Sequence, residues 1–279
     1  MEHLSEEKKE VLIQKANDIR KSIIKMLVEA KSGHTAGPLG MSDIFSYLYF
    51  HSLKHDPENP KMEDRDRLIL SNGHICPVLY ATLAHAGYFE LEELQTLRKF
   101  GSRLQGHPHR EFLDCLENSS GPLGSGISQA VGMALADRID RGDKTIYCLT
   151  GDGELNEGQN WEAIMHAAKY KLDNLILIVD RNYIQFDGFT EDVMPLDPLV
   201  NKFESFNFKV IDINGHDFDM IDGAIRKAKN TLNMPTVIIA NNIPSKGVPE
   251  WENKPEWHGK APSIEEGEMA LRELSKISN

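Results

Sequence analysis

The sequence has few cysteines, no surplus of positive charge and no long apolar run. Its three cysteines, Cys76, Cys115 and Cys148, show no CxxC spacing, and their apolar surroundings predict buried thiols in a reducing compartment. Lys and Arg number 31 against 43 Asp and Glu, and this net charge of −12 argues against nonspecific binding to nucleic acid or anionic membranes. No stretch approaches the roughly eighteen apolar residues of a membrane helix, and the charged N-terminus MEHLSEEKKE lacks the apolar region of a signal peptide. We therefore expect a cytoplasmic protein that binds neither nucleic acid nor membrane.

The chain also lacks internal repeats, low-complexity tracts and a recognisable linker. Its 279 residues can bury a large core. Strand-like and helix-like segments alternate throughout, which predicts an α/β fold with a mostly parallel sheet and helices on both faces. The segment 241–262 is irregular and holds two tryptophans and four prolines, which favours a lid or an interface. Ser263 and Glu266 then form a capping-box pattern that predicts a last helix over 263–276.

The most informative stretch is a strand–turn–helix–strand unit. The apolar run 145–150 leads into Gly-Asp-Gly with Asp152 at its centre, a helix-like stretch covers 156–170, and a buried strand over 175–179 leads to Asn182. In a parallel sheet both loops follow the carboxyl ends of their strands, where open α/β sheets bind ligands. Two oxygen-bearing side chains and a free carbonyl there suit a hard cation such as Mg²⁺, which leaves coordination positions for phosphate oxygens. The unit therefore predicts a metal-bridged diphosphate.

Two simpler explanations compete with this prediction. Asp-Gly after a strand is usually only a turn. The pattern Asp152-x-Glu154-x-Asn156 also resembles the start of a calcium-binding EF-hand loop, but the sixth position is Glu157 instead of glycine, and a strand precedes it. The EF-hand explanation therefore fails, whereas the turn explanation stands for the tripeptide taken alone.

Four histidines lie in separate loops rich in glycine or proline. They are His34, His74, His107 and His258, and the other seven histidines are assigned no role. The loop around His34 is expected over 31–40, ahead of a helix over 41–53. Four loop imidazoles fit a cleft that handles an anion and proton transfers. For any one of them alone, a hydrogen-bonded or solvated loop histidine is the simpler explanation.

The whole stretch from Gly151 to Gly188, GDGELNEG…IQFDG, resembles the thiamine diphosphate motif, and its amino-acid sequence is most similar to that of transketolase. Further segments match that family in order: SGHTAGPLGMSD, LKHDPENPKMEDRDRLILSNGH, GHP, SSGPLGSG and KGVPEWENKPEWHGKAP. The resemblance covers nearly the whole chain and corresponds to the N-terminal half of transketolases. It implies the thiamine diphosphate-binding fold, with 1–279 forming one diphosphate-binding domain. Thr35-Ala36 departs from the Pro-Gly of many family members, and the last segment looks more like short-chain transketolases.

The resemblance also implies roles for individual residues. Asp152, Asn182 and the backbone carbonyl of Ile184 would hold Mg²⁺ or Ca²⁺. The residues implied in binding thiamine diphosphate are His74, Gly121, Leu123, Asp152, Gly153, Glu157, Asn182, Ile184 and His258. Of these, the backbone of Gly121 and Leu123 would contact the aminopyrimidine, and Glu157 would fall near a dimer interface. The residues implied in catalysis, through hydrogen bonds to the sugar and proton transfer, are His34, His74, His107 and His258.

The resemblance implies a partner as well. Transketolases carry, after the matched region, a pyrimidine-binding domain whose glutamate activates the cofactor, and this chain ends at Asn279 without such a unit. We therefore expect the N-terminal subunit of a split transketolase, paired with a separate C-terminal pyrimidine-binding subunit in an α₂β₂ assembly. It would transfer a two-carbon ketol unit from a ketose to an aldose, as in pentose phosphate metabolism. The donor stays open and could carry phosphate or another anionic group such as sulfonate.

Two other functions fit part of the sequence. The α subunit of a thiamine-dependent 2-oxoacid dehydrogenase also carries GDG…N and also lacks the pyrimidine domain, but the SGH, SNGH and GHP loops speak against it. A non-catalytic paralogue that keeps only the fold is disfavoured because Asp152, Asn182 and the four loop histidines are all present.

Overall fold

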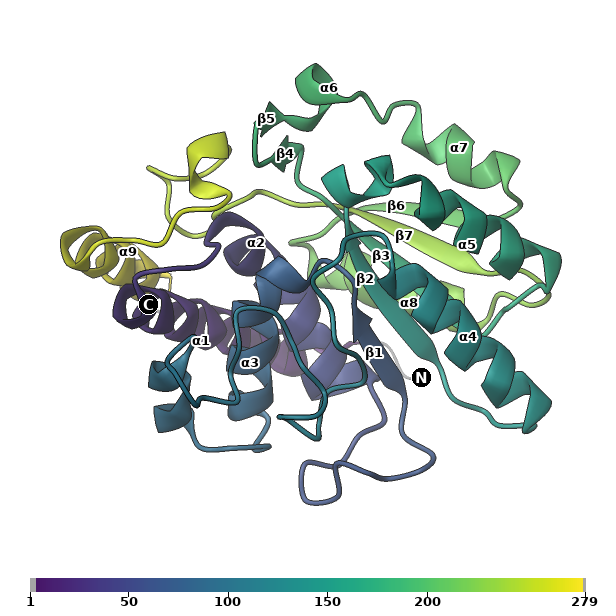
Figure 1. Cartoon of the computed structure of the whole chain (residues 1–279), viewed down its shortest axis with the longest axis horizontal. Helices are drawn as coiled ribbons and strands as arrows, with labels where there is room; N and C mark the ends of the chain where they lie inside the picture. Colours follow the sequence, from purple (N-terminus) through teal and green to yellow (C-terminus); the bar gives the residue numbers. More distant parts are fainter. Residues whose placement is uncertain (1–3, 278–279) are drawn as a thin grey trace.

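A five-stranded parallel sheet forms the centre of the molecule (Figure 1). This computed structural model describes residues 4–277. The strands lie in the order β1-β2-β3-β7-β6, and all four neighbouring pairs are parallel. Their bounds are β1 Arg67–Leu70, β2 Ile146–Gly151, β3 Leu175–Arg181, β6 Lys209–Asn214 and β7 Thr236–Asn241. Two short strands, β4 Ile184–Gln185 and β5 Gly188–Phe189, form a separate antiparallel pair, which the short helix α6 Thr190–Val193 follows.

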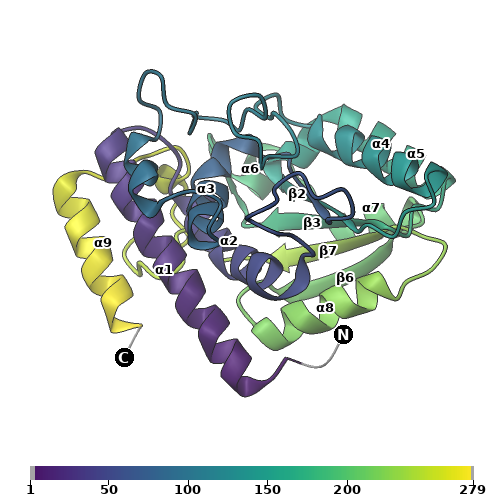
Figure 2. The same ribbon diagram turned by 90° about the horizontal axis from the view of Figure 1, so that it is seen from below.

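Helices cover both faces of the sheet (Figure 2). One side holds α4 Gly126–Ile139, α5 Gly158–Lys169 and α7 Leu199–Ser205. The other holds α1 Glu6–Ala30, α2 Ala36–Tyr47, α3 Cys76–His85 and α8 Phe218–Lys229, with α9 Ile264–Lys276 packed against α1. Residues of β2 alternate between the two cores, because Tyr147 and Leu149 pack on the α1 side and Ile146 and Cys148 on the α4 side. The expected α/β class with helices on both faces is confirmed.

The register of the sheet brings the loops after β2 and β3 together. Gly151 pairs with Asp180, and Arg181 pairs with Asn241. The loop after β2 therefore starts beside the last residues of β3, and the 3₁₀ turn η4 Gly153–Asn156 follows at once. This edge, at the carboxyl ends of the strands, is where parallel sheets bind ligands.

The segment around His34 differs from the prediction. Residues 36–40 are not loop but the first turns of α2, which continues into a π-helical turn η1, Leu48–Ser52. Pro38 is compatible with a first helical turn, because the N–H it lacks has no partner there. Gly40 permits close packing, since a Cβ there would lie 3.0 Å from the carbonyl oxygen of Ile243. The small residues therefore serve helix packing, and only residues up to Thr35 remain loop.

The C-terminal part of the chain is more ordered than an irregular segment. Within 241–262, Asn241 ends β7 and Pro255–Trp257 forms the 3₁₀ turn η5, and the rings of Trp251 and Trp257 stack with centroids 3.8 Å apart. The capping box predicted for the last helix is present, with Ser263 at the N-cap of α9. Two further 3₁₀ turns are η2 Gly73–Ile75 and η3 Leu91–Thr96.

The cysteines agree with the expectation of thiols, since all three are free. Cys76 and Cys148 are buried, whereas Cys115 is only half-buried. Among the helices of residues 4–277, none is long and apolar enough to cross a membrane.

Candidate active site

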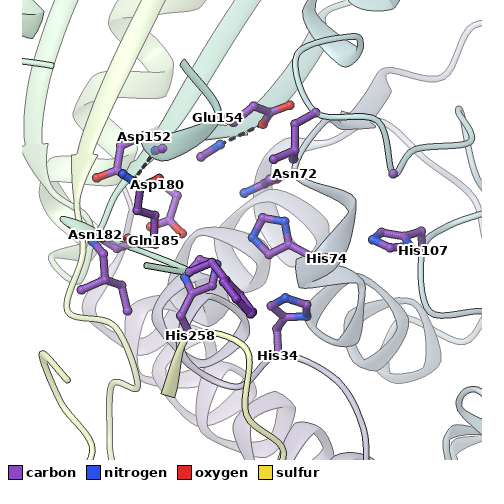
Figure 3. Close-up of a pocket in the computed structure, with 16 residues that line it drawn as sticks. His34, Asn72, His74, His107, Asp152, Glu154, Asp180, Asn182, Gln185 and His258 are labelled. Carbon is purple, nitrogen blue, oxygen red and sulfur yellow. Dashed lines mark hydrogen bonds between the residues drawn. The ribbon is translucent and has the colours of Figure 1, made fainter. Parts of the chain in front are cut away.

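A cavity of about 280 Å³ opens at the carboxyl ends of β1, β2 and β3 (Figure 3). The predicted site residues that line it are His34, His74, His107, Gly121, Leu123, Asp152, Gly153, Asn182, Ile184 and His258. Glu157, predicted among the cofactor-binding residues, does not line it. Its side chain is exposed at the N-cap of α5, just past η4, so this chain gives Glu157 no contact with the cavity.

Asp152 is buried and held from several sides. Its Oδ1 accepts a hydrogen bond from the N–H of Gly153 at 2.7 Å, and its Oδ2 accepts one from the N–H of Tyr183 at 2.8 Å. Oδ2 also lies 3.2 Å from Nη1 of the buried Arg181, whose Nη2 reaches Glu191 at 2.6 Å. Burial raises the pKa of Asp152 to about 6, against the lowering effect of the guanidinium. The carboxylate therefore has one fixed orientation at the edge of the cavity.

Asn182 is oriented by a second buried carboxylate, Asp180. The Nδ2 of Asn182 donates to Oδ2 of Asp180 at 2.8 Å, and its Oδ1 accepts from the N–H of Ile184 at 3.1 Å. Oδ1 of Asp180 accepts from Nδ2 of Asn242 at 2.7 Å. Burial raises the pKa of Asp180 to about 7. These hydrogen bonds fix the orientation of the Asn182 amide, because Nδ2 must donate to Asp180 and Oδ1 must accept from Ile184.

The donor set around Asp152 fits a hard cation that is shared with an anion. Asp152, Asn182 and Ile184 offer a carboxylate, an amide and a backbone carbonyl oxygen, which are ligands of Mg²⁺ and Ca²⁺. Within residues 4–277 no three His, Cys, Asp or Glu side chains form a metal-binding group. A hard cation held by these three groups keeps coordination positions for water or for the oxygens of a bound anion. Gly153 packs closely against Gln185, because a Cβ at this position would lie 3.1 Å from Cβ of Gln185.

Three of the four predicted histidines form one cluster (Figure 3). Their ring centroids lie 4.9 Å apart for His34 and His74, 5.3 Å for His74 and His258, and 5.6 Å for His34 and His258. His107 comes from a separate loop and lines the same cavity. Burial lowers the pKa of His34 and of His258 to about 4, and it also lowers the pKa of His74 and of His107. The four imidazoles are therefore neutral near pH 7, so that each can donate one hydrogen bond and accept another.

Several buried polar atoms around the cavity make no hydrogen bond within the described residues. They are Nδ2 and Oδ1 of Asn72, Nδ1 of His34 and of His258, and Nε2 of Gln185. Buried polar atoms in proteins are nearly always paired. Unpaired atoms on several sides of one cavity therefore indicate a polar ligand that fills it.

Sequence reasoning missed four polar side chains of this cavity, which are Asn72, Glu154, Asp180 and Gln185. The signal that could have found them is adjacency. Asn72 stands two residues before His74, Glu154 directly follows Gly153, and Asp180 stands two residues before Asn182. Each of these three lies beside a residue that the motifs identify.

Comparisons with known proteins identify proteins that are similar to this chain. Residues 12–274 match the family model described as "Transketolase, thiamine diphosphate binding domain". A 6-deoxy-6-sulfo-D-fructose transketolase subunit of Clostridium sp. (strain MSTE9) is 41% identical, and the match covers 95% of this chain and 96% of that protein. One subunit of the apulose-4-phosphate transketolase of Phocaeicola vulgatus is 38% identical, over 92% of this chain and 91% of that protein.

Solved structures give the same result for the fold. The crystal structure of transketolase from Campylobacter jejuni is similar with a TM-score of 0.89 at 38% sequence identity. The match covers 96% of this chain but only 42% of the Campylobacter chain. The chain therefore corresponds to part of a long transketolase and to nearly the full length of the shorter relatives.

Proposed function

Because the chain belongs to the transketolase family, in which it corresponds to the thiamine diphosphate-binding domain, we propose that it is the cofactor-binding subunit of a two-chain transketolase. It transfers a two-carbon ketol unit from a ketose to an aldose. The observation that carries the proposal is the cavity that joins Asp152 and Asn182 with four neutral histidines. Membership of this family also argues against a 2-oxoacid dehydrogenase subunit.

We propose a set of contacts for each part of the cofactor. In the proposed arrangement Asp152, Asn182 and the carbonyl of Ile184 hold Mg²⁺ or Ca²⁺. Gly153, together with His74 and His258, contacts the diphosphate, and the backbone of Gly121 and Leu123 contacts the aminopyrimidine. The unpaired atoms of Asn72 and Gln185 support the presence of a polar ligand between these groups.

The histidines supply the contacts to the sugar. When bound, thiamine diphosphate provides the electron sink that allows a ketose carbon–carbon bond to break. His34, His107 and His258 hydrogen-bond the sugar hydroxyl and carbonyl oxygens and move protons between them. Their neutral state at pH 7 suits this role, because a neutral imidazole can accept a proton from a hydroxyl and return it later.

An apolar rim at the mouth of the cavity supports a partner subunit. The rim is defined by Phe186, Phe189, Val193 and Met194, whose side chains are between 42% and 78% exposed. It lies on the turn between β4 and β5, on β5, on α6 and on the residue after α6, and these elements stand away from the sheet in Figure 1. Phe186 lines the cavity, so a protein that covers the rim also closes the cofactor site. We assign this surface to a separate C-terminal pyrimidine-binding subunit, two copies of each chain forming an α₂β₂ assembly.

The substrate class follows from the relatives. One is named for a sulfonated fructose and the other for apulose 4-phosphate, so both act on a ketose with a strong anionic group. We propose an anionic ketose for this chain as well. Determinants for the far end of the sugar lie on the partner.

The proposal is tested by reconstitution. This chain is purified alone and together with a candidate C-terminal subunit, and ketol transfer is measured with a panel of phosphorylated and sulfonated ketoses. We expect activity only from the pair, with thiamine diphosphate and Mg²⁺ present. Full activity of the isolated chain would contradict the two-chain part, and release of CO₂ from pyruvate by the pair would contradict the transketolase reaction.

A further inference from the structure

One buried carboxylate, that of Glu154, which Figure 3 labels at the edge of the cavity, accepts hydrogen bonds from three other segments of the chain. Its Oε1 accepts hydrogen bonds from the hydroxyl of Ser71 at 2.5 Å and from the N–H of Gly124 at 2.7 Å. Its Oε2 accepts from the hydroxyl of Thr150 at 2.7 Å and from the N–H of Gly151 at 3.1 Å. These four neutral donors match the full accepting capacity of a carboxylate. Glu154 is 3% exposed, so the charge is held by these hydrogen bonds away from solvent.

Ser71 extends the network to the start of α4. Its hydroxyl oxygen accepts a hydrogen bond from the N–H of Gly126, the first residue of α4, at 3.1 Å. Ser71 is fully buried, and a Cβ on Gly126 would lie 2.4 Å from the Cβ of Ser71. The N–H groups of Gly124 and Gly126 are therefore both fixed to side chains at the ends of β1 and β2. The backbone of 121–123 comes directly before them.

Within 121–125 the other side-chain hydrogen bonds lie on the exposed side of the loop, and one runs from the hydroxyl of Ser125 to the carbonyl oxygen of Pro122 at 2.7 Å. Gly121 and Gly124 have φ angles of +147° and +83°, in the positive region that glycine adopts readily and other residues rarely adopt. On the solvent side, the carbonyl of Leu123 accepts one hydrogen bond from the exposed side chain of Gln159 at 2.8 Å. The buried anchor thus comes from the strand ends, through Ser71 and Glu154.

We propose that Glu154 and Ser71 are positioning residues that hold the backbone of 121–123 against the aminopyrimidine of thiamine diphosphate. The inference rests on the proposed function, because it requires that this loop contacts the cofactor. Glu154, the residue after Gly-Asp-Gly, thereby has a positioning role. Its buried side chain connects the metal end of the cofactor site to the pyrimidine end.

The structure offers a matched pair of variants. Ser71→Ala and Thr150→Val each remove one buried hydroxyl that donates to the same carboxylate, and both positions are fully buried. Only Ser71 also accepts a hydrogen bond from the N–H of Gly126, directly after the loop 121–125, whereas Thr150 belongs to β2. In the reconstituted pair we expect Ser71→Ala to raise the Kd for thiamine diphosphate about tenfold, since two hydrogen bonds that fix the loop are lost. We expect Thr150→Val to change it less than about threefold, and the KM for the sugar donor to stay within about twofold in both.

Hydrogen exchange provides a second measurement that needs no variant. The amides of Gly124 and Gly126 in the cofactor-free wild-type pair should exchange slowly, and Ser71→Ala should accelerate both. Equal effects of the two variants on the Kd for thiamine diphosphate, or wild-type amides that exchange as fast as open loops, would overturn the positioning role. A wild-type pair that binds no thiamine diphosphate would instead overturn the proposed function, and this inference with it.

Discussion

We expect that replacing Phe189 with alanine weakens association with the partner subunit without unfolding this chain. Phe189 ends β5, and its side chain is 46% exposed, so the rim has apolar area available for a partner. A phenylalanine side chain presents about 200 Å², so covering the exposed share removes about 90 Å² from water. At about 25 cal/mol per Å² this amounts to about 2 kcal/mol, or about thirtyfold in Kd.

The control is Leu232→Ala. Leu232 is 73% exposed and precedes β7, at the amino-terminal edge of the sheet and thus opposite the cavity. Titration of a fluorescently labelled partner into each variant gives the Kd, and thermal unfolding of each isolated chain reports folding. We expect a normal Kd for Leu232→Ala and a raised one for Phe189→Ala, with the melting temperatures of both close to wild type. Equal Kd values for the two variants would show that the rim is not the docking surface.

Three further predictions follow from the site. Burial lowers the pKa of His34 in the folded chain from 6.5 to about 4. Between pH 6.5 and pH 4 the unfolded chain therefore binds more protons than the folded chain. The free energy of unfolding falls as the pH falls, by about 3 kcal/mol at pH 4. His34→Gln removes this part of the pH dependence of the free energy of unfolding, and an unchanged dependence would contradict a buried neutral ring. Asp152→Asn should weaken thiamine diphosphate binding about a hundredfold and abolish its dependence on Mg²⁺, measured by calorimetry, whereas wild-type binding that survives EDTA would argue against a metal. Asn72→Ala removes no side-chain hydrogen bond of the described structure, so the free energy of unfolding should change by less than about 1 kcal/mol. The Kd for thiamine diphosphate should rise about tenfold. A lowered melting temperature with an unchanged Kd would count against a ligand contact.

The part of the fold that the sequence predicts best is the unit around Gly151–Gly153. Its two strands are buried on both faces, so they appear as unbroken apolar runs, and the carboxyl ends of parallel strands meet at one edge whatever the strand order. Asp152 and Asn182 line the same cavity because β2 and β3 are also neighbours in the sheet. Periodicity fails for the start of α2, because Gly37 and Gly40 have the composition of a loop and pack tightly only against Ile75 and Ile243. That contact joins residues far apart in the chain.

The clustering of the histidines could not be derived from local pattern. His34, His74 and His258 come from loops whose proximity depends on the order β1-β2-β3-β7-β6, and only the resemblance to transketolase predicts that they meet. The role of Glu154 could not be derived from the sequence either. In the sequence it is one acid among several after Gly-Asp-Gly, and its role depends on donors from Ser71 and Gly124, which lie 83 and 30 residues away.

The two-chain enzyme is tested by measuring the ketol-transferase activity of separately purified subunits that are mixed at increasing ratio. We expect no activity from this chain alone, a rise that saturates at one partner chain per copy of this chain, and a complete requirement for thiamine diphosphate. Activity of the isolated chain at the level of the mixture, or a mixture indifferent to thiamine diphosphate, would contradict this expectation.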